Sequence, residues 1–175
     1  MDSEIKNILL AEDDPGDAEL TLAALEDHLV SKFVVVVNGE EALDYLYRRG
    51  KFKMRAGGNP VVVLLDNKMP KLSGLEVLKI VKADKHLKSI PIVVLTSSRE
   101  TLDLIEFYKH GVNAYVVKPV AFPEFMSVIK QLVVFWTAIN EPPPNTGRAE
   151  TSIERGEIVF SEQQEMPAPH LVLGE

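Results

Sequence analysis

The stretch VVVLLDNKMP, residues 61–70, places five aliphatic residues directly before an aspartate, Asp66. A strand that is apolar at every position is typical of a parallel sheet covered by helices on both faces. A carboxylate loses solvation free energy when it is buried, so a charged residue at the end of such a strand favours a functional site. The stretch therefore predicts a central buried strand with a ligand-binding or reactive residue at its carboxyl end.

The rest of the chain alternates strand and helix patterns around this strand. Apolar runs predict strands over 8–11, 33–37, 61–65, 90–95 and 114–117. Periodic apolar positions predict helices over 17–28, between Asn38 and Gly50, and over 73–83, 99–110 and 122–139. Asn38 with Glu41 and Ser73 with Glu76 are helix-capping pairs. The alternation predicts an α/β fold, a flavodoxin-like doubly wound five-stranded parallel sheet with strand order 2-1-3-4-5 and helices on both faces.

Composition narrows the class of protein. The chain has 175 residues, a net charge of -7, 46% apolar residues and no cysteine. The absence of cysteine excludes disulfides and thiolate metal sites, and the negative charge disfavours nucleic acid and anionic lipid as partners. The first residues are too polar for a signal peptide, and no run of 18 apolar residues occurs, so we expect a cytoplasmic protein with no membrane contact.

The sequence changes character after Asn140. The segment EPPPN is a rigid polyproline segment that ends the preceding predicted helix. The residues from Asn145 onward contain six Glu and two Arg, a net charge of -4. Such a segment is too polar to form its own core. We expect residues 1–141 to form the folded domain and 142–175 to be a flexible, Pro-rich and acidic extension.

Unusual residues follow four of the predicted strands. The carboxyl ends of parallel strands share one edge of the sheet, so these side chains are expected to meet there. They are Glu12, Asp13, Asp66, Thr96 and Lys118. Crowded carboxylates require a cation, and oxygen ligands suit Mg²⁺. The set suits phosphoryl transfer to a carboxylate, with Asp66 as nucleophile and with Lys118 and Thr96 holding phosphoryl oxygens.

Taken singly, each of these residues has an ordinary interpretation. Glu12 and Asp13 suit a solvated turn before a helix, and Lys118 suits a protein surface. Their occurrence together at matching strand ends favours a site. A hydrolytic phosphatase of the dehalogenase type is disfavoured, because Lys68 stands where that chemistry needs an acid. A phosphorylation-independent binding module remains the alternative.

The chain resembles the receiver domain of two-component response regulators over residues 6 to about 140. Thr96, Tyr115 and Lys118 lie 30, 49 and 52 residues after Asp66, the separations of that family. The matching residues are Glu12, Asp13, Asp66 in LLDNKMP, Gly74, Thr96 in VVLTS, Tyr115 in NAYVVKP, and Lys118 before Pro119. The resemblance implies a signalling protein, not an enzyme in the usual sense, that accepts a phosphoryl group on Asp66 from a sensor histidine kinase.

The resemblance also implies roles for individual residues. Asp13 and Asp66 are expected to bind Mg²⁺ directly, Glu12 through water, and Lys68 through its backbone carbonyl. Thr96 and Tyr115 are expected to act as a switch, and the Lys118–Pro119 bond to be cis. Lys68 is a departure from the family pattern, and its positive side chain two residues after Asp66 is expected to prolong the life of the phosphoaspartate.

A narrower resemblance concerns three segments: EDDPGDAELTLAAL, RRGKFKMRAGGNPVVVLLD and VAFPEFMSVIKQLVVFWTAINEPPP. They are similar to the small stand-alone receivers that partner bacterial phytochromes, which implies a phytochrome-type kinase.

The last predicted helix has more apolar residues than one inward-facing stripe can hold, and this excess implies a second apolar face. An exposed apolar face commonly marks a contact with a partner. We expect a two-fold homodimer through this helix, the fourth helix and the fifth strand, with Phe135 and Trp136 as anchors. The alternative is that the acidic extension covers the face.

Overall fold

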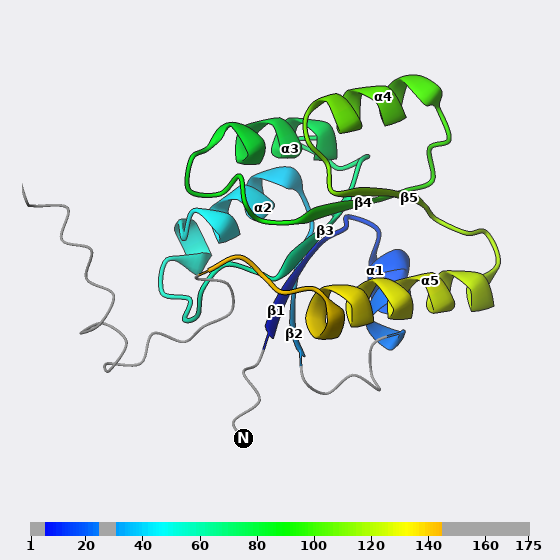
Figure 1. Cartoon of the computed structure of the whole chain (residues 1–175), viewed down its shortest axis with the longest axis horizontal. Helices are drawn as coiled ribbons and strands as arrows, with labels where there is room; N and C mark the ends of the chain where they lie inside the picture. The colour runs from blue at the N-terminus through cyan, green and yellow to red at the C-terminus, as the bar shows by residue number, and fades with distance from the viewer. Residues whose placement is uncertain (1–5, 25–30, 145–175) are drawn as a thin grey trace, which may run out of the picture.

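The computed structural model describes residues 6–24 and 31–144. Within these residues five strands form one parallel sheet in the order β2-β1-β3-β4-β5, which confirms the flavodoxin-like prediction. The strands are β1 (Lys6–Ala11), β2 (Ser31–Val36), β3 (Val62–Asp66), β4 (Ile92–Thr96) and β5 (Ala114–Val117). Helices cover both faces of the sheet (Figure 1).

The helices follow the strands in alternation. They are α1 (Pro15–Ala23), α2 (Gly39–Leu46), α3 (Gly74–Ala83), α4 (Thr101–Lys109) and α5 (Phe122–Val134), with a 3-10 turn η1 (Gly50–Phe52) and a π-helical turn η2 (Phe135–Ile139). Residues of α1 and α5 pack on one face of the sheet, and residues of α2, α3 and α4 pack on the other (Figure 1).

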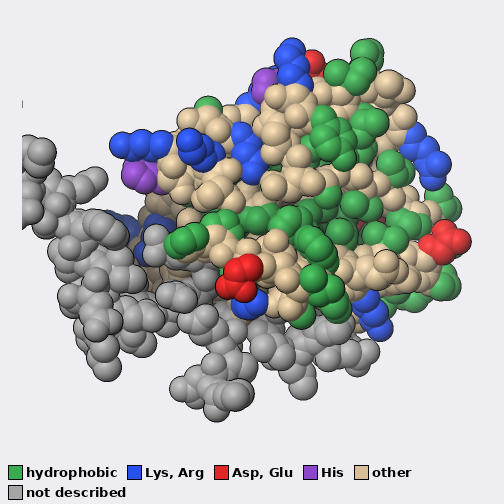
Figure 2. Space-filling model, viewed as in Figure 1, with side chains coloured by type: hydrophobic (Ala, Val, Ile, Leu, Met, Phe, Trp, Pro, Cys, Tyr) green, Lys and Arg blue, Asp and Glu red, His purple; other side chains and the backbone are tan. Residues whose placement is uncertain are grey.

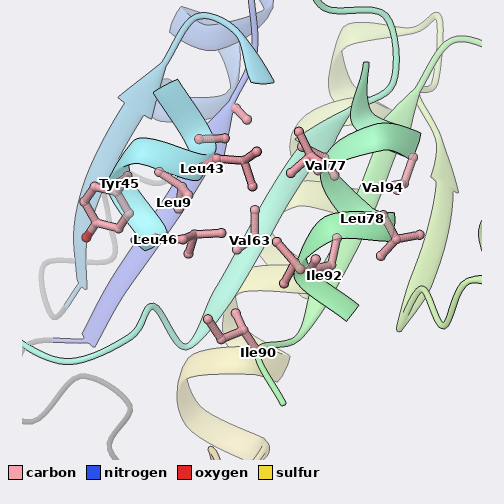
Figure 3. Packing of buried hydrophobic residues seen from close by; sticks show 14 of the residues in the cluster. Leu9, Leu43, Tyr45, Leu46, Val63, Val77, Leu78, Ile90, Ile92 and Val94 are labelled. Carbon is pink, nitrogen blue, oxygen red and sulfur yellow. The ribbon is translucent and has the colours of Figure 1, made fainter. Parts of the chain in front are cut away.

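The uniform apolarity of β3 has a direct structural reason. Val63 and Leu65 point into the cluster formed with α2, α3 and α4, whereas Val62 and Leu64 point into the cluster formed with α1 and α5. Figure 3 shows Val63 on the first of these faces, among side chains of α2, α3 and β4. Both faces of β3 are buried, so an alternating polar residue would lose its hydration.

The predicted caps are present. The Asn38 side chain accepts a hydrogen bond from the Glu41 amide, and Ser73 and Glu76 form a reciprocal capping box. The first helix begins at Pro15 instead of Asp17, because Asp14 caps it and proline suits the first helical position. The second helix ends at Leu46, before Gly50. Residues 25–28, which were predicted to continue the first helix, lie outside the described residues.

The segment before β3 is held to α2 by Arg55. Its guanidinium lies 4.3 Å from the centre of the Tyr45 ring and donates hydrogen bonds to the carbonyls of Tyr45, at 2.8 Å, and Gly58, at 2.9 Å. Burial lowers the pKa of Arg55, and Tyr45 partly offsets that effect. The segment is therefore anchored to the domain.

The stretch Phe122–Ile139 is long and apolar enough to cross a membrane, judged by length and composition alone. This is weak evidence, because the core helix of a soluble protein passes the same test. Phe125, Ile129 and Val133 are buried in the cluster that α1 and α5 form on the sheet. Packing within the domain thus explains one apolar stripe of this stretch, while Phe122, Phe135 and Ile139 are exposed.

The two residues predicted to anchor a dimer differ in their exposure to solvent. Phe135 is 44% exposed, whereas Trp136 is buried against the sheet with Val133. Trp136 continues the inward stripe of α5, so its ring is not available to a partner in this structure. The homodimer stays a prediction, with Phe135 as the anchor that is exposed. The extension from residue 145 onward lies outside the described residues.

Candidate functional site

Three strand ends bring opposite charges together. Asp66 is the last residue of β3, Glu12 follows β1, and Lys118 follows β5. The Lys118 Nζ lies 2.6 Å from Glu12 Oε2 and 3.2 Å from Asp66 Oδ1. A third carboxylate, that of Asp17 in α1, accepts a hydrogen bond from the same Nζ at 2.7 Å. One ammonium group therefore serves three carboxylates.

The backbone fixes the position of Asp66. Its Oδ2 accepts a hydrogen bond from the Lys68 amide at 2.7 Å, and the residue is 7% exposed. Gly74 lies against it, since a Cβ there would stand 2.3 Å from the Asp66 carbonyl oxygen. The Gly74 amide also donates to the Asn67 carbonyl at 2.9 Å. The first turn of α3 can approach the end of β3 this closely because residue 74 lacks a side chain.

The acidic residues are close enough to share a cation. Glu12, Asp13 and Asp66 each offer a carboxylate oxygen, and these oxygens lie within 4.8 Å of one another. Glu12 and Asp66 are buried and Asp13 is exposed, so the group is open to solvent on one side. Three oxygen donors without nitrogen or sulfur fit a hard divalent cation such as Mg²⁺.

Burial and charge shift two pKa values at the site. Burial raises the pKa of Glu12, and the hydrogen bond and positive charge of Lys118 oppose this shift without cancelling it. Burial by itself would lower the pKa of Lys118, but its hydrogen bonds to Asp17 and Glu12 and the charge of Asp66 raise it well above the usual range. Lys118 therefore stays protonated near neutral pH and supplies a permanent positive charge.

A second network lies between β4 and α4. Thr96 is buried, and its hydroxyl oxygen accepts a hydrogen bond from the Ser98 amide at 3.1 Å. The Ser98 hydroxyl donates to Asp103 of α4 at 2.7 Å. The Tyr115 hydroxyl donates to the Ser98 carbonyl at 3.4 Å, while its ring packs against Phe107 with 5.5 Å between ring centres. Ser98 thus connects Thr96, Tyr115 and the first turn of α4.

The structure places the site residues predicted from the sequence as follows. Glu12, Asp13, Asp66 and Lys118 meet at the carboxyl edge of the sheet, while Thr96 ends the strand next to β3. Lys68 contacts Asp66 through its amide, and its side chain is exposed.

The prediction that the Lys118–Pro119 bond is cis is wrong, because the described residues contain no cis peptide bond. The trans isomer is the more stable form of an X–Pro bond by about 0.5–1 kcal/mol, and Lys118 reaches its partners from it.

Sequence reasoning missed Asp17, Ser98 and Asp103. Asp17 was assigned only as the start of a helix, and its contact with Lys118 joins residues 101 positions apart. The sequence carries no local signal for this contact, because Asp13 precedes both α1 and its N-cap Asp14, and Lys118 is far away along the chain. Ser98 and Asp103 are five positions apart and do not form a capping pair, since Glu100 is the N-cap of α4.

Comparison with known proteins agrees with this arrangement. The family model described as the response regulator receiver domain matches residues 8–130. The probable methanogenesis regulatory protein FilR2 of Methanothrix harundinacea is 35% identical over 140 residues, which cover 78% of this chain and 86% of FilR2. The response regulator Rcp1 of Synechocystis is 32% identical over 132 residues, which cover 75% of this chain and 88% of Rcp1.

Solved structures give the same result. The bacteriophytochrome response regulator AtBRR is 55% identical, with a TM-score of 0.64 and coverage of 79% of this chain and 99% of AtBRR. The phosphorylated cyanobacterial phytochrome response regulator RcpA is 33% identical, with a TM-score of 0.75. The Mn²⁺-bound form of Rcp1 is 31% identical, with a TM-score of 0.74. Each of these two alignments covers 79% of this chain and 99% of the chain of the solved structure. The chain belongs to the response regulator receiver domain family.

Proposed function

We propose that this receiver domain accepts a phosphoryl group on Asp66 from a sensor histidine kinase of the phytochrome type, with Mg²⁺, and passes the signal on through protein contacts. The observation that carries the proposal is the meeting of Asp66 with Lys118 Nζ at 3.2 Å beside the carboxylates of Glu12 and Asp13. This arrangement has a nucleophile, a permanent positive charge and a place for a divalent cation.

The chemistry is transfer from a phosphohistidine. A carboxylate oxygen of Asp66 forms a bond to phosphorus, the bond from phosphorus to the imidazole nitrogen breaks, and the electron pair stays on that nitrogen. Lys118 holds a phosphoryl oxygen by hydrogen bond and charge. The Thr96 hydroxyl accepts a hydrogen bond from the Ser98 amide, and its own proton can be donated to another phosphoryl oxygen.

Glu12, Asp13, Asp66 and the backbone carbonyl of Lys68 are the groups that would hold Mg²⁺. A bound Mg²⁺ supplies neutralisation of phosphoryl charge. The relatives support both parts of the proposal, since RcpA was solved in phosphorylated form and Rcp1 with Mn²⁺. The names of AtBRR and RcpA, which refer to phytochromes, support the type of kinase.

We propose a surface for the kinase beside the site. Leu20 of α1, together with Val120 and Phe122 after β5, expose apolar side chains around a depression that Asp17 and Lys118 also line. A histidine kinase must bring its phosphohistidine to Asp66, so an apolar surface at this edge is well placed to bind it. We call Leu20, Val120 and Phe122 the entry surface.

The proposed output uses the face of α4, β5 and α5. Phosphorylation adds negative charge and acceptor oxygens at Asp66, which would draw Thr96 and disturb its contact with Ser98. Hydrophobic side chains gather on this face (Figure 2), with Leu102, Ile105 and Tyr108 of α4 and Phe135 and Ile139 of η2 exposed. We propose that a second copy of the chain binds there, forming a homodimer.

The test is incubation with acetyl phosphate and Mg²⁺ followed by intact-mass measurement, then transfer from an autophosphorylated phytochrome-type kinase. We expect one phosphoryl group on the wild type and none on Asp66→Asn. Asp84→Asn, which removes a carboxylate at the end of α3, is the control and should be labelled like the wild type. No labelling of the wild type would favour the alternative, a phosphorylation-independent binding module, whereas equal labelling of Asp66→Asn would show that another residue accepts the phosphoryl group.

A further inference from the structure

The ammonium of Lys118 contacts both Asp66, the proposed nucleophile, and a carboxylate of α1. Its hydrogen bonds go to Glu12 at 2.6 Å and Asp17 at 2.7 Å, whereas Asp66 Oδ1 stands farther away, at 3.2 Å. A lysine has three N–H donors, so two of them are directed at groups other than the nucleophile.

Asp17 differs from Glu12 and Asp66 in its position relative to the cation site and in its exposure to solvent. Glu12 and Asp66 belong with Asp13 to the group of oxygens that fits a cation, and Asp17 does not. Its side chain is 40% exposed, against 4% for Glu12 and 9% for Asp66. Asp17 lies in the first turn of α1, where a negative charge is stabilised by the helix amides.

We infer that Asp17 is a positioning residue that restrains Lys118 and lowers the affinity of the site for a phosphoryl group. The inference rests on the proposed function and concerns regulation of the same site. A phosphoryl group on Asp66 brings acceptor oxygens that need the Lys118 donors, and the hydrogen bond to Asp17 competes for one of them. The unphosphorylated arrangement is stabilised by this contact, so removing the contact shifts the equilibrium towards the phosphoryl-bound arrangement.

The direction of the effect separates this role from a structural one. A variant that merely loosened the domain would bind a phosphoryl group less well. Loss of a competing restraint makes it bind better. General loss of a negative charge also favours an anion, so the comparison needs a variant that removes a nearby charge without touching Lys118.

Asp14→Asn provides that control. Asp14 is the cap of α1, three residues before Asp17, and its side chain accepts a hydrogen bond from the Asp17 amide, whereas the carboxylates that Lys118 contacts are those of Glu12, Asp17 and Asp66. Asparagine caps helices as well as aspartate does, so the variant loses charge and keeps the cap. Asp17→Asn makes the same chemical change at the proposed position, and Asp17→Glu keeps a carboxylate there.

The experiment measures the affinity of each protein for the phosphoryl analogue beryllium trifluoride at saturating Mg²⁺, with thermal unfolding recorded in parallel. We expect Asp17→Asn to bind the analogue about threefold to tenfold more tightly than the wild type, the range for losing a charged hydrogen bond that is partly exposed. Asp14→Asn should stay within about twofold of the wild type, the size of a screened charge effect, and Asp17→Glu should stay close to it.

The possible results distinguish the inference from the proposed function. If the wild type binds and Asp17→Asn binds no more tightly than Asp14→Asn, the role of Asp17 is refuted and the proposed function stands. If the wild type does not bind the analogue at all, both the proposed function and the role of Asp17 are refuted.

Discussion

At the scale of single residues, Lys118 links the acidic groups of the site. Its ammonium contacts Glu12, Asp17 and Asp66, and its positive charge opposes the burial that raises the pKa of Glu12. A buried ion pair of this kind adds little to the free energy of unfolding, because desolvation offsets much of the attraction. It places a positive charge beside the proposed nucleophile, Asp66.

Gly74 allows the close contact between α3 and the end of β3, where Asp66 lies. In Gly74→Ala the new Cβ would stand 2.3 Å from the Asp66 carbonyl, which forces the backbone apart. We expect a loss of about 2 kcal/mol in the free energy of unfolding, typical of overpacking, together with weaker phosphorylation. Urea unfolding measures the first effect. Gly16→Ala is the control, because its Cβ meets only the flexible end of Asp14 at 3.1 Å, and equal losses in the two variants would contradict this account.

Lys68 places an exposed side chain two residues after Asp66, while its amide binds the carboxylate. Its positive charge can pair with the phosphoryl group and obstruct an attacking water molecule. We therefore expect Lys68→Asn to lose its phosphoryl group several-fold faster than the wild type, the factor that corresponds to the free energy of one weak ion pair. The decay of labelled protein after removal of the donor measures this rate. Lys85→Asn, at a distant exposed position, should decay like the wild type, and identical rates for all three proteins would refute the role of Lys68.

At the scale of elements, the loop between β4 and α4 depends on Ser98. The residue binds Thr96 through its amide, Tyr115 through its carbonyl and Asp103 through its hydroxyl. A movement of Thr96 therefore acts on both the α4 start and the Tyr115 ring through one residue. This is the physical route by which the proposed phosphorylation would change the output face.

Ser98→Ala removes the hydrogen bond to the charged Asp103 and the one from the Glu100 amide. We expect a loss of about 1–2 kcal/mol in the free energy of unfolding and faster amide exchange in the first turn of α4. Hydrogen exchange followed by mass spectrometry localises the change. Ser97→Ala, whose side chain is exposed, is the matched control. Unchanged exchange at α4 in Ser98→Ala would show that the contact does not hold the helix.

Most elements and the core of the site could be predicted because their signals are local. The five buried aliphatics before Asp66 and the caps at Asn38 and Ser73 are each readable in a short stretch, whereas Lys118 was identified from its family separation of 52 residues from Asp66. The Asp17 contact was not readable, since it depends on α1 beginning at Pro15 and on β5 ending beside it. The burial of Trp136 was misjudged because apolar residues crowd η2, although it continues the stripe of Ile129 and Val133.

At the scale of the whole molecule, the exposed apolar residues of α4 and η2 determine how two copies would meet. Phe135 and Ile139 border a shallow groove along α5 that Leu132 also lines. Trp136 is a poor test of the interface, because its replacement would leave a cavity in the core.

We expect Phe135→Ala combined with Ile139→Ala to convert a dimer to a monomer, because the two substitutions remove the exposed apolar anchors. Sedimentation velocity at one fixed protein concentration measures the change. Met54→Ala removes an equally apolar side chain that is 89% exposed elsewhere, and it should sediment like the wild type. A double variant that stays dimeric, or a wild type that is monomeric, would place the interface elsewhere or exclude it.

The position of Asp17 has a consequence for partner binding. Its carboxylate lines the same depression as the entry surface, where a visiting protein's basic side chain would find an acceptor among apolar groups. Such a contact would replace the ion pair between Asp17 and Lys118 with one between Asp17 and the partner protein, and Lys118 would be free to bind Asp66. The affinity for the partner protein and the affinity for the phosphoryl group would then be linked. Linkage is reciprocal, so phosphorylation would raise the affinity for the partner by the same factor by which the partner raises the affinity for the phosphoryl group.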